Sequence, residues 1–182
     1  MGGCAGVYVG TGATVVTAAV EERGLGGATT DLAIATNIHA LWLKYNHDLV
    51  VSLDTTISEG RVLLTGTVPT QEDRIDAVRL VWKSPGVKRV NNEIEVRGSD
   101  GIASYSRDSW ITTQLVTKLT FDQDIQSINY SVETANSVVY LMGIAQNQAE
   151  IERALNHARR VRYVRRVVSY VRLKDVPLPK GK

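Results

Sequence analysis

The sequence has little material for metal or disulfide chemistry. Its 182 residues include one cysteine, Cys4, and three widely separated histidines, His39, His47 and His157. A single cysteine cannot close a disulfide within the chain or supply a multi-cysteine zinc site. None of the histidines has an acidic residue at a spacing typical of a metal or catalytic site. We therefore predict no disulfide framework and no metal centre.

Recognisable catalytic motifs are also missing. The sequence has no Gly-x-Ser-x-Gly elbow, no Gly-x-x-x-x-Gly-Lys-Ser/Thr phosphate-binding loop and no His-Glu-x-x-His zinc motif. Asp122 and Asp124 are predicted to be surface turn residues. We expect a protein that binds rather than catalyses, and that needs no cofactor.

Long apolar runs are absent, since no stretch of 18 or more apolar residues occurs. Charged residues make up 22% of the chain and the net charge is +2, which excludes a disordered polyelectrolyte. With 43% hydrophobic residues, the composition is that of a folded globular protein. The length predicts one domain or two small ones.

Residues 1–29 differ from the rest of the chain. They hold eight of the 15 glycines, mixed with Ala, Val and Thr. Glycine loses more backbone entropy on ordering than any other residue, so this stretch is a poor core. We predict a flexible leader or tether over 1–29.

The remainder of the chain repeats itself. A shift of 77 residues aligns 31–96 with 108–173 without a gap, and eleven of the 66 positions are identical. The identical pairs include Asp31/Asp108, Ile34/Ile111, Thr36/Thr113, Val62/Val139, Leu64/Leu141, Gly66/Gly143, Gln71/Gln148 and Ala77/Ala154. We predict two copies of one domain, at 30–97 and 108–174, with a linker at 98–107 and a flexible tail at 175–182.

Each copy has the pattern helix, strand, strand, helix, strand. In the first copy, Thr30 or Asp31 is expected to begin a helix whose apolar residues recur at helical spacing: Ile34, Ile38, Leu41 and Trp42. Alternating residues from Val51 to Ile57 predict a strand. Thr70 and Asp73 resemble a capping box before the second helix. The expected fold class is α+β, with a three-stranded sheet covered by two helices in each copy. The strand order stays open.

Two landmarks of this pattern resemble the BON-domain family. The first copy carries them at Val62–Gly66 and Gly86–Val90. The second carries them at Val139–Gly143 and Val164–Val167, with Tyr163 in place of the glycine. The resemblance implies two tandem αββαβ domains, of the kind found in outer-membrane lipoproteins of Gram-negative bacteria.

Cys4 is a candidate lipidation site. The sequence Gly2-Gly3-Cys4-Ala5 resembles the end of a lipobox, although no charged or apolar signal region precedes it. The family resemblance implies a lipid anchor at Cys4, which would hold the chain at the periplasmic face of the outer membrane. The alternative is a free cysteine in a flexible leader.

Charge differs between the copies. Residues 31–97 contain 8 Lys and Arg against 9 Asp and Glu, whereas residues 108–174 contain 9 against 6. The candidate basic residues of the second copy are Arg159, Arg160, Arg162, Arg166 and Arg172. They would attract anionic phospholipid. A solvated face, pairing with the acidic first copy or another partner are the alternatives, and nucleic acid is not expected.

Trp110 begins the candidate lipid-binding helix of the second copy. We expect it in the first helical turn, where a tryptophan could lie in a membrane interface, and we add Ile111, Gln114, Leu115 and Lys118 to the site. Packing of Trp110 on the other copy is the alternative. Trp42 and Trp82 are predicted to be core residues.

These observations favour a non-enzymatic, phospholipid-binding envelope lipoprotein. The family resemblance implies a role in outer-membrane integrity, including under osmotic stress. The alternative is a periplasmic adaptor that docks envelope proteins without recognising lipid headgroups. The oligomeric state stays open.

Overall fold

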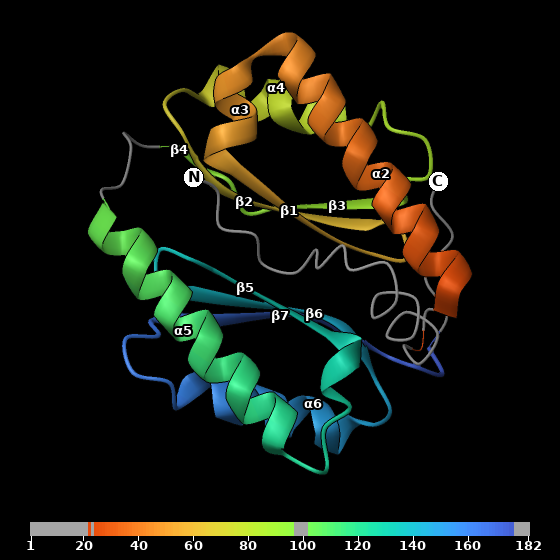
Figure 1. Ribbon diagram of the computed structural model, residues 1–182, viewed down its shortest axis with the longest axis vertical. Helices are drawn as coiled ribbons and strands as arrows, with labels where there is room; N and C mark the ends of the chain where they lie inside the picture. The colour runs from red at the N-terminus through yellow and green to blue at the C-terminus, as the bar shows by residue number, and fades with distance from the viewer. Residues whose placement is uncertain (1–21, 23, 97–101, 177–182) are drawn as a thin grey trace. The chain divides into compact units, whose positions relative to one another are not determined.

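The computed structural model describes Glu22 and residues 24–96 and 102–176, which form two compact units divided after Ser99 (Figure 1). Each unit combines helices with one small mixed sheet, so the predicted α+β class is confirmed. Cys4 lies outside the described residues, as does most of the predicted leader.

The first unit contains three helices and four strands among its described residues. Their order is α2 (Gly24–Tyr45), α3 (His47–Ser52), β1 (Leu53–Ser58), β2 (Arg61–Val68), α4 (Gln71–Val81), β3 (Arg89–Asn92) and β4 (Glu95–Val96).

The second unit repeats the arrangement with one short 3-10 turn in place of α3. Its order is α5 (Ile102–Phe121), η1 (Ser127–Asn129), β5 (Tyr130–Ala135), β6 (Val138–Ala145), α6 (Gln148–Arg159) and β7 (Arg166–Leu173).

The sheets have the same topology in both units. The central strands β2 and β6 pair antiparallel with the preceding strand, through a hairpin, and parallel with the strand that follows the second helix. A helical crossover is what a parallel pair requires. In the first unit the last strand is interrupted at Glu93 and Ile94, so β3 and β4 both pair with β2. That sheet therefore has four strands rather than the three predicted.

The first helix of each unit begins earlier than predicted. Helix α2 starts at Gly24 and α5 starts at Ile102, so Asp31 and Asp108 lie inside helices rather than at their N-caps. Each aspartate instead accepts two hydrogen bonds from the backbone of a hairpin turn. Asp31 binds the N–H groups of Glu59 and Gly60, both at 2.8 Å.

Asp108 repeats this arrangement in the second unit. It binds the N–H groups of Asn136 at 2.6 Å and Ser137 at 2.8 Å. Both residues of each turn have a positive φ, as a tight hairpin turn of this kind requires. The aspartate thus joins the first helix of a unit to its β-hairpin.

The apolar stripes of the first helices form the cores. Ile34, Ile38 and Trp42 are buried in the first unit, as predicted, and Trp42 Nε1 donates a hydrogen bond to the Ala77 carbonyl at 3.1 Å. Ile111, Leu115 and Leu119 occupy the same positions in the second unit.

Trp82 departs from the prediction, because 53% of its surface is exposed. It is the C-cap of α4, one residue beyond the helix. The core positions of that helix are taken by Ala77, Leu80 and Val81. Thr70 begins the helix as predicted, with its hydroxyl accepting a hydrogen bond from Asp73 N at 3.1 Å.

The segment before β1 also differs from the prediction. Val51 belongs to the short helix α3 and not to a strand, and β1 begins at Leu53. The Asn46 side chain caps α3 by accepting a hydrogen bond from Asp48 N at 3.0 Å. Leu49 is the buried residue of α3, so burial of this one side chain holds the extra turn against the core.

Two glycines at equivalent positions within the central strands β2 and β6 have one physical role. At Gly66 and Gly143, both with positive φ, a Cβ atom would clash with the backbone carbonyl of Ser52 and Asn129 respectively. Only glycine fits so close a backbone approach.

Across the helices of the described residues, none is both long and apolar enough to cross a bilayer.

Candidate functional site

A tyrosine with an unusual backbone conformation marks the candidate site. Tyr163 lies in the loop between α6 and β7 and has a φ of +69°. Bulky residues rarely adopt this left-handed conformation, which costs about 1–2 kcal/mol. The aligned position in the first unit is Gly86, with a φ of +93°. The second unit therefore keeps a strained side chain where its counterpart has glycine.

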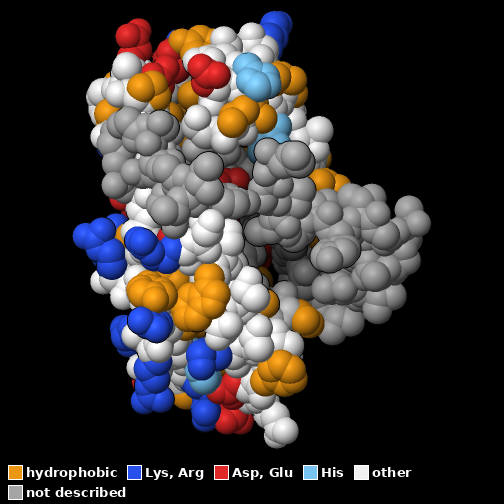
Figure 2. Space-filling model, turned by 60° about the vertical axis from the view of Figure 1, so that its left-hand side comes forward, with side chains coloured by type: hydrophobic (Ala, Val, Ile, Leu, Met, Phe, Trp, Pro, Cys, Tyr) orange, Lys and Arg blue, Asp and Glu red, His pale blue; other side chains and the backbone are white. Residues whose placement is uncertain are grey.

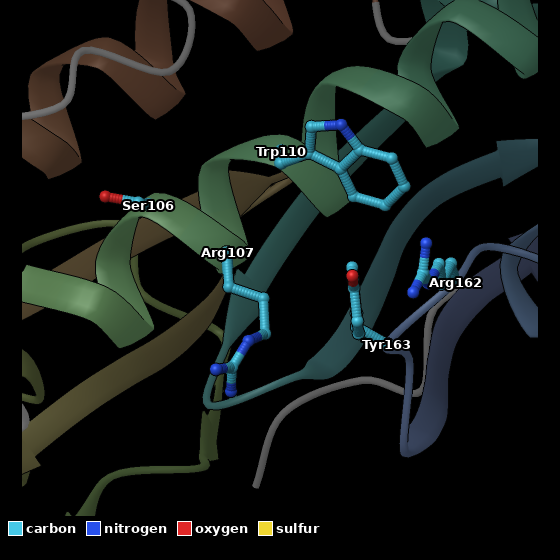
Figure 3. Close-up of a pocket in the computed structure, with 5 residues that line it drawn as sticks. All are labelled: Ser106, Arg107, Trp110, Arg162 and Tyr163. Carbon is cyan, nitrogen blue, oxygen red and sulfur yellow. The ribbon is translucent and has the colours of Figure 1, made fainter.

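The Tyr163 ring holds three side chains around it. Its centroid lies 5.7 Å from that of Trp110 in an edge-to-face arrangement, 4.6 Å from Arg162 Cζ and 6.0 Å from Arg107 Cζ. These are aromatic and cation–π contacts. Figure 3 shows Arg107 and Arg162 on either side of Tyr163, with Trp110 above it.

These side chains line an open pocket between α5 and the loop after α6. We call it the Tyr163 pocket; its volume is about 530 Å³ and it is lined by Ser106, Arg107, Trp110, Arg162 and Tyr163. Neither Arg107 nor Arg162 has a carboxylate partner among the residues that the structure describes. The pocket thus places two guanidinium groups beside two aromatic rings.

Helix α5 carries a second feature, an exposed face that runs away from the pocket. We define the α5 face by residues at helical spacing: Trp110, Gln114, Thr117, Lys118 and Phe121. Trp110 is 42% exposed and Phe121, at the end of the helix, is 81% exposed. Eleven residues at 1.5 Å each place the two rings about 16 Å apart along the helix.

The threonines of α5 make its surface less polar than the sequence suggests. The hydroxyls of Thr113, Thr117 and Thr120 each donate a hydrogen bond, at 2.8–2.9 Å, to the carbonyl four residues earlier. Their hydrogen-bonding needs are met within the helix. Burial of these threonines against another surface would therefore leave no hydroxyl donor without an acceptor.

The structure brings together some of the predicted site residues. Trp110 and Arg162 meet at Tyr163, and Gln114 and Lys118 share the α5 face with Trp110. Ile111 and Leu115 are a correction, because both are fully buried in the core of the second unit. They face the sheet, so they are not surface residues. Trp110 itself is in the third turn of α5, not in the first.

The other predicted arginines lie on different surfaces. Arg159, at the end of α6, is exposed and donates to Asn156 Oδ1 at 3.3 Å, and Arg160 follows it. Arg166 and Arg172 are on β7 and alternate with the core residues Val167 and Val171, so they occupy the opposite face of the sheet.

Arg172 is also engaged by its own strand end. Its guanidinium donates hydrogen bonds to the carbonyls of Leu173, Lys174 and Val176 at 2.8–3.3 Å.

The lower half of Figure 2 shows hydrophobic side chains gathered among Lys and Arg side chains on one face.

A charged cluster near the end of α5 gives one histidine an acidic partner that the sequence analysis did not find. His157 Nε2 lies 2.7 Å from Asp122 Oδ2, although the two residues are 35 positions apart. Arg153 lies 2.7 Å from Asp124 and 3.7 Å from Asp122. The hydrogen bond from His157, with help from the Asp124 backbone and the charge of Arg153, lowers the pKa of Asp122. This cluster ties the α5 end to α6, and the structure's described residues contain no group arranged to hold a metal ion.

Three site residues were missed by sequence reasoning. Arg107 lies in the segment predicted as linker, Phe121 follows the predicted apolar stripe, and Tyr163 was noted only as a departure from glycine. The spacing of eleven residues between Trp110 and Phe121 could have indicated that both lie on one side of a helix. No sequence pattern indicates the contact of Tyr163 with α5, because that contact depends on how the second unit packs.

Comparison with known proteins identifies the two units. The BON domain model matches residues 30–98 and again residues 107–175. The chain belongs to the BON-domain family. Both BON domains contain the αββαβ order described above, and the Tyr163 pocket and the α5 face belong to the second BON domain.

Similar BON-domain proteins come from several bacteria. The chain is 42% identical over 135 residues to an uncharacterized protein in the gshII 5′ region of Anaplasma centrale, covering 74% of this chain and 89% of that protein. It is 28% identical to the outer membrane lipoprotein DolP of Haemophilus influenzae, covering 95% and 90%. It is 29% identical to the osmotically-inducible protein Y of Escherichia coli, covering 82% and 76%.

Proposed function

We propose that this BON-domain protein binds anionic phospholipid membranes, without catalysis, through its second domain. The observation that carries the proposal is the α5 face, where Trp110 and Phe121 stand at the two ends and Lys118 lies between them. Aromatic side chains are favoured at membrane interfaces, and cations near an anionic surface contribute about 1 kcal/mol each.

The proposed setting is the periplasmic face of the outer membrane of a Gram-negative bacterium, with a lipid anchor on Cys4. The similarity to an outer membrane lipoprotein over most of both chains supports it. A lipid anchor and a membrane-binding surface would act together, because two weak attachments raise each other's effective concentration. The proposed role is maintenance of membrane integrity, including under osmotic stress, which the similarity to an osmotically-inducible protein supports.

Sedimentation of the unlipidated chain with liposomes tests the proposal. Phosphatidylglycerol-containing vesicles should bind it more tightly than phosphatidylcholine vesicles, and raising salt from about 10 to about 100 mM should weaken binding, because the screening length shortens from about 30 to about 10 Å. Failure to bind either vesicle would reject membrane binding by the second domain.

Variants locate the surface. Trp110→Ala and Lys118→Glu should each weaken binding about tenfold, since burial of half an indole and reversal of one charge are each worth about 1–2 kcal/mol. Phe121→Ser should weaken it at least as much, because its ring is the more exposed. Trp82→Ala is the matched control, since Trp82 is an exposed tryptophan of the first domain.

The second candidate function is protein docking, and α4 favours it. Ile75 and Trp82, seven residues apart, are 57% and 53% exposed on one side of this helix. An adaptor would bind its envelope partner independently of lipid charge. Vesicle binding that is absent in the wild type would favour this function, whereas vesicle binding that Trp82→Ala weakens more than Trp110→Ala does would place the membrane-binding surface on the first domain.

A further inference from the structure

We infer that an exposed apolar face of α2, in the first domain, joins two copies of this chain as an antiparallel pair of helices about a twofold axis. The face consists of four residues at helical spacing, which we call the α2 ridge: Leu32, Thr36, Ala40 and Leu43. The inference goes beyond the proposed function and does not depend on it, because the α5 face belongs to the second domain.

The α2 ridge faces away from the core of the first domain. At 3.6 residues per turn it lies on the side of the helix opposite Ile34, Ile38 and Trp42, whose side chains are buried. All four ridge residues are exposed, and Leu32 and Leu43 are each 56% exposed. Figure 1 shows α2 along the outside of the first unit. Apolar side chains that gather on one exposed face, rather than singly, mark interaction surfaces.

The equivalent positions of the second domain are polar. The shift of 77 residues places four exposed hydroxyl residues on α5 where α2 has its ridge: Ser109, Thr113, Thr117 and Thr120. A BON domain therefore folds without leucine at the two ends of this face. The apolar ends of the α2 ridge belong to the surface of the first domain and are not a requirement of the fold.

The α2 ridge can be buried at little cost in lost hydration. The Thr36 hydroxyl donates a hydrogen bond to the Leu32 carbonyl at 2.9 Å, so it needs no further acceptor. Between Asp31 and Lys44, the helix has no Lys, Arg, Asp or Glu. Burial of this face against an apolar surface therefore leaves no charged side chain without water.

The absence of charge favours a second copy of the chain as the partner. A twofold axis brings a surface against its own copy, so a charged face meets like charges and an uncharged face does not. The α5 face fails this requirement because it carries Lys118. Twofold dimers are also the commonest assemblies of soluble proteins.

The spacing of the ridge is symmetric as well. Leu32 and Leu43 are equally far along the helix from its midpoint between positions 37 and 38, and Thr36 and Ala40 lie on either side of that point. Two antiparallel helices that cross there would place Leu32 of one copy beside Leu43 of the other. The smaller side chains would lie at the crossing, and residues four apart form the ridges by which helices commonly pack.

Analytical ultracentrifugation of the full-length, unlipidated chain tests the inference. One helix face is smaller than the roughly 800 Å² per partner of a standard interface, so we expect a weak dimer with a Kd of about 10–100 µM. The sedimenting mass should rise from that of the monomer at about 1 µM toward that of the dimer at about 500 µM. A chain that stays monomeric over this range would overturn the inference.

A single charge on the ridge should prevent the contact. Ala40→Glu places two carboxylates near the twofold axis and should raise the Kd about tenfold or more. Thr117→Glu is the matched control, because it adds the same charge at the equivalent exposed position of α5, and it should change the Kd less than about twofold. Circular dichroism checks that both variants fold. A dimer that survives Ala40→Glu, or that Thr117→Glu weakens as much, contradicts the inference.

Disulfide trapping tests the antiparallel arrangement. In a Cys4→Ser background, chains with Thr36→Cys are mixed with chains with Ala40→Cys and oxidised in air. Residues 36 and 40 of opposite copies face each other at the proposed crossing, so the mixed disulfide should form in preference to a disulfide between like chains. A preference for like chains would overturn the antiparallel pair.

The outcomes separate this inference from the proposed function. A dimer that forms in solution and is lost in Ala40→Glu stands even if the chain ignores vesicles, in which case membrane binding alone fails. A monomeric chain that binds vesicles through Trp110 and Lys118 overturns the dimer and leaves the proposed function intact. A monomeric chain whose vesicle binding is weakened by Ala40→Glu also overturns the dimer, because the α2 ridge then contacts the membrane.

Discussion

In the first domain, the helix that precedes the last strand exposes Ile75 and Trp82, whereas the aligned positions of the second domain are the polar residues Glu152 and Arg159. The first helices show the reverse. Trp110 and Phe121 are exposed on α5, and their counterparts on α2 are Ala33 and Lys44.

The interiors of the two domains agree far better than these surfaces do. The apolar stripes of α2 and α5 coincide, and both domains use an aspartate to hold a hairpin turn. A duplicated fold keeps its core because each substitution there costs packing energy, while exposed positions change freely. The two domains therefore share a core and differ in the surfaces that they offer to a partner.

The largest expected effect separates a buried from an exposed tryptophan. Trp42→Ala should destabilise the first domain by about 3–5 kcal/mol, because it empties a core site and leaves the Ala77 carbonyl without its donor. Trp82→Ala should change stability by less than about 0.5 kcal/mol. Urea unfolding followed by circular dichroism measures both, and equal effects would contradict the assignment of Trp82 to the surface.

Hydrogen exchange sharpens the same experiment. Amide protection of β6 in the Trp42→Ala protein reports on the second domain alone. Retained protection would show that the second domain folds without the first, and lost protection would show that the two unfold together.

Substitution of the equivalent aspartates, Asp31 and Asp108, should lower the stability of the two domains by similar amounts. Asp31→Ala and Asp108→Ala each remove the acceptor of two turn N–H groups, at an expected cost of about 2–3 kcal/mol. Thermal unfolding of the two variants makes the comparison. A large cost at one site and none at the other would break the equivalence of the domains.

Gly86, which the first domain has at the position of Tyr163, should tolerate substitution poorly. Gly86→Ala places a side chain at positive φ, with its Cβ 3.1 Å from Ile34 Cδ1, and should cost about 1–2 kcal/mol. In the second domain, Tyr163→Ala keeps the strained backbone and removes only the ring contacts. Urea midpoints of the two variants show whether the loops differ in this way.

The smallest expected effect is a shift in the pKa of Asp122. A carboxyl whose pKa is lowered on folding stabilises the fold above its unfolded pKa, and this contribution is lost as the pH falls through the folded pKa. Carbon NMR should give Asp122 a midpoint below the ordinary value of 3.8. His157→Ala removes the principal cause and should raise that midpoint toward the ordinary value. An unchanged midpoint would place the cause with Arg153 and the Asp124 backbone.

The parts of the fold that could be predicted follow from local periodicity. The helix stripes at Ile34 and Ile111 and the cap at Thr70 are written in neighbouring residues, so the sequence alone indicates them. The exposure of Trp82 and the burial of Leu49 in α3 depend on which other side chains occupy the core of the folded domain. The periodicity of a short segment does not indicate which side chains those are.

The candidate site was only partly predictable for the same reason. Trp110 and Arg162 were both expected to bind lipid, but nothing local indicated that they meet through Tyr163, 53 residues from Trp110. The predicted arginines of β7 were separated from this site by strand alternation, which places Arg166 and Arg172 on the other face of the sheet.

The parallel pairing of β6 with β7 has a consequence for the order in which the second domain is completed. The central strand gains its neighbour over eight residues only after the whole of α6 has been added to the chain. A chain that stops before Arg166 would leave one edge of β6 open along its length, and an open apolar edge is a template for pairing with other chains. Premature termination in this domain would therefore yield an aggregating protein, not a folded one that has merely lost a ligand.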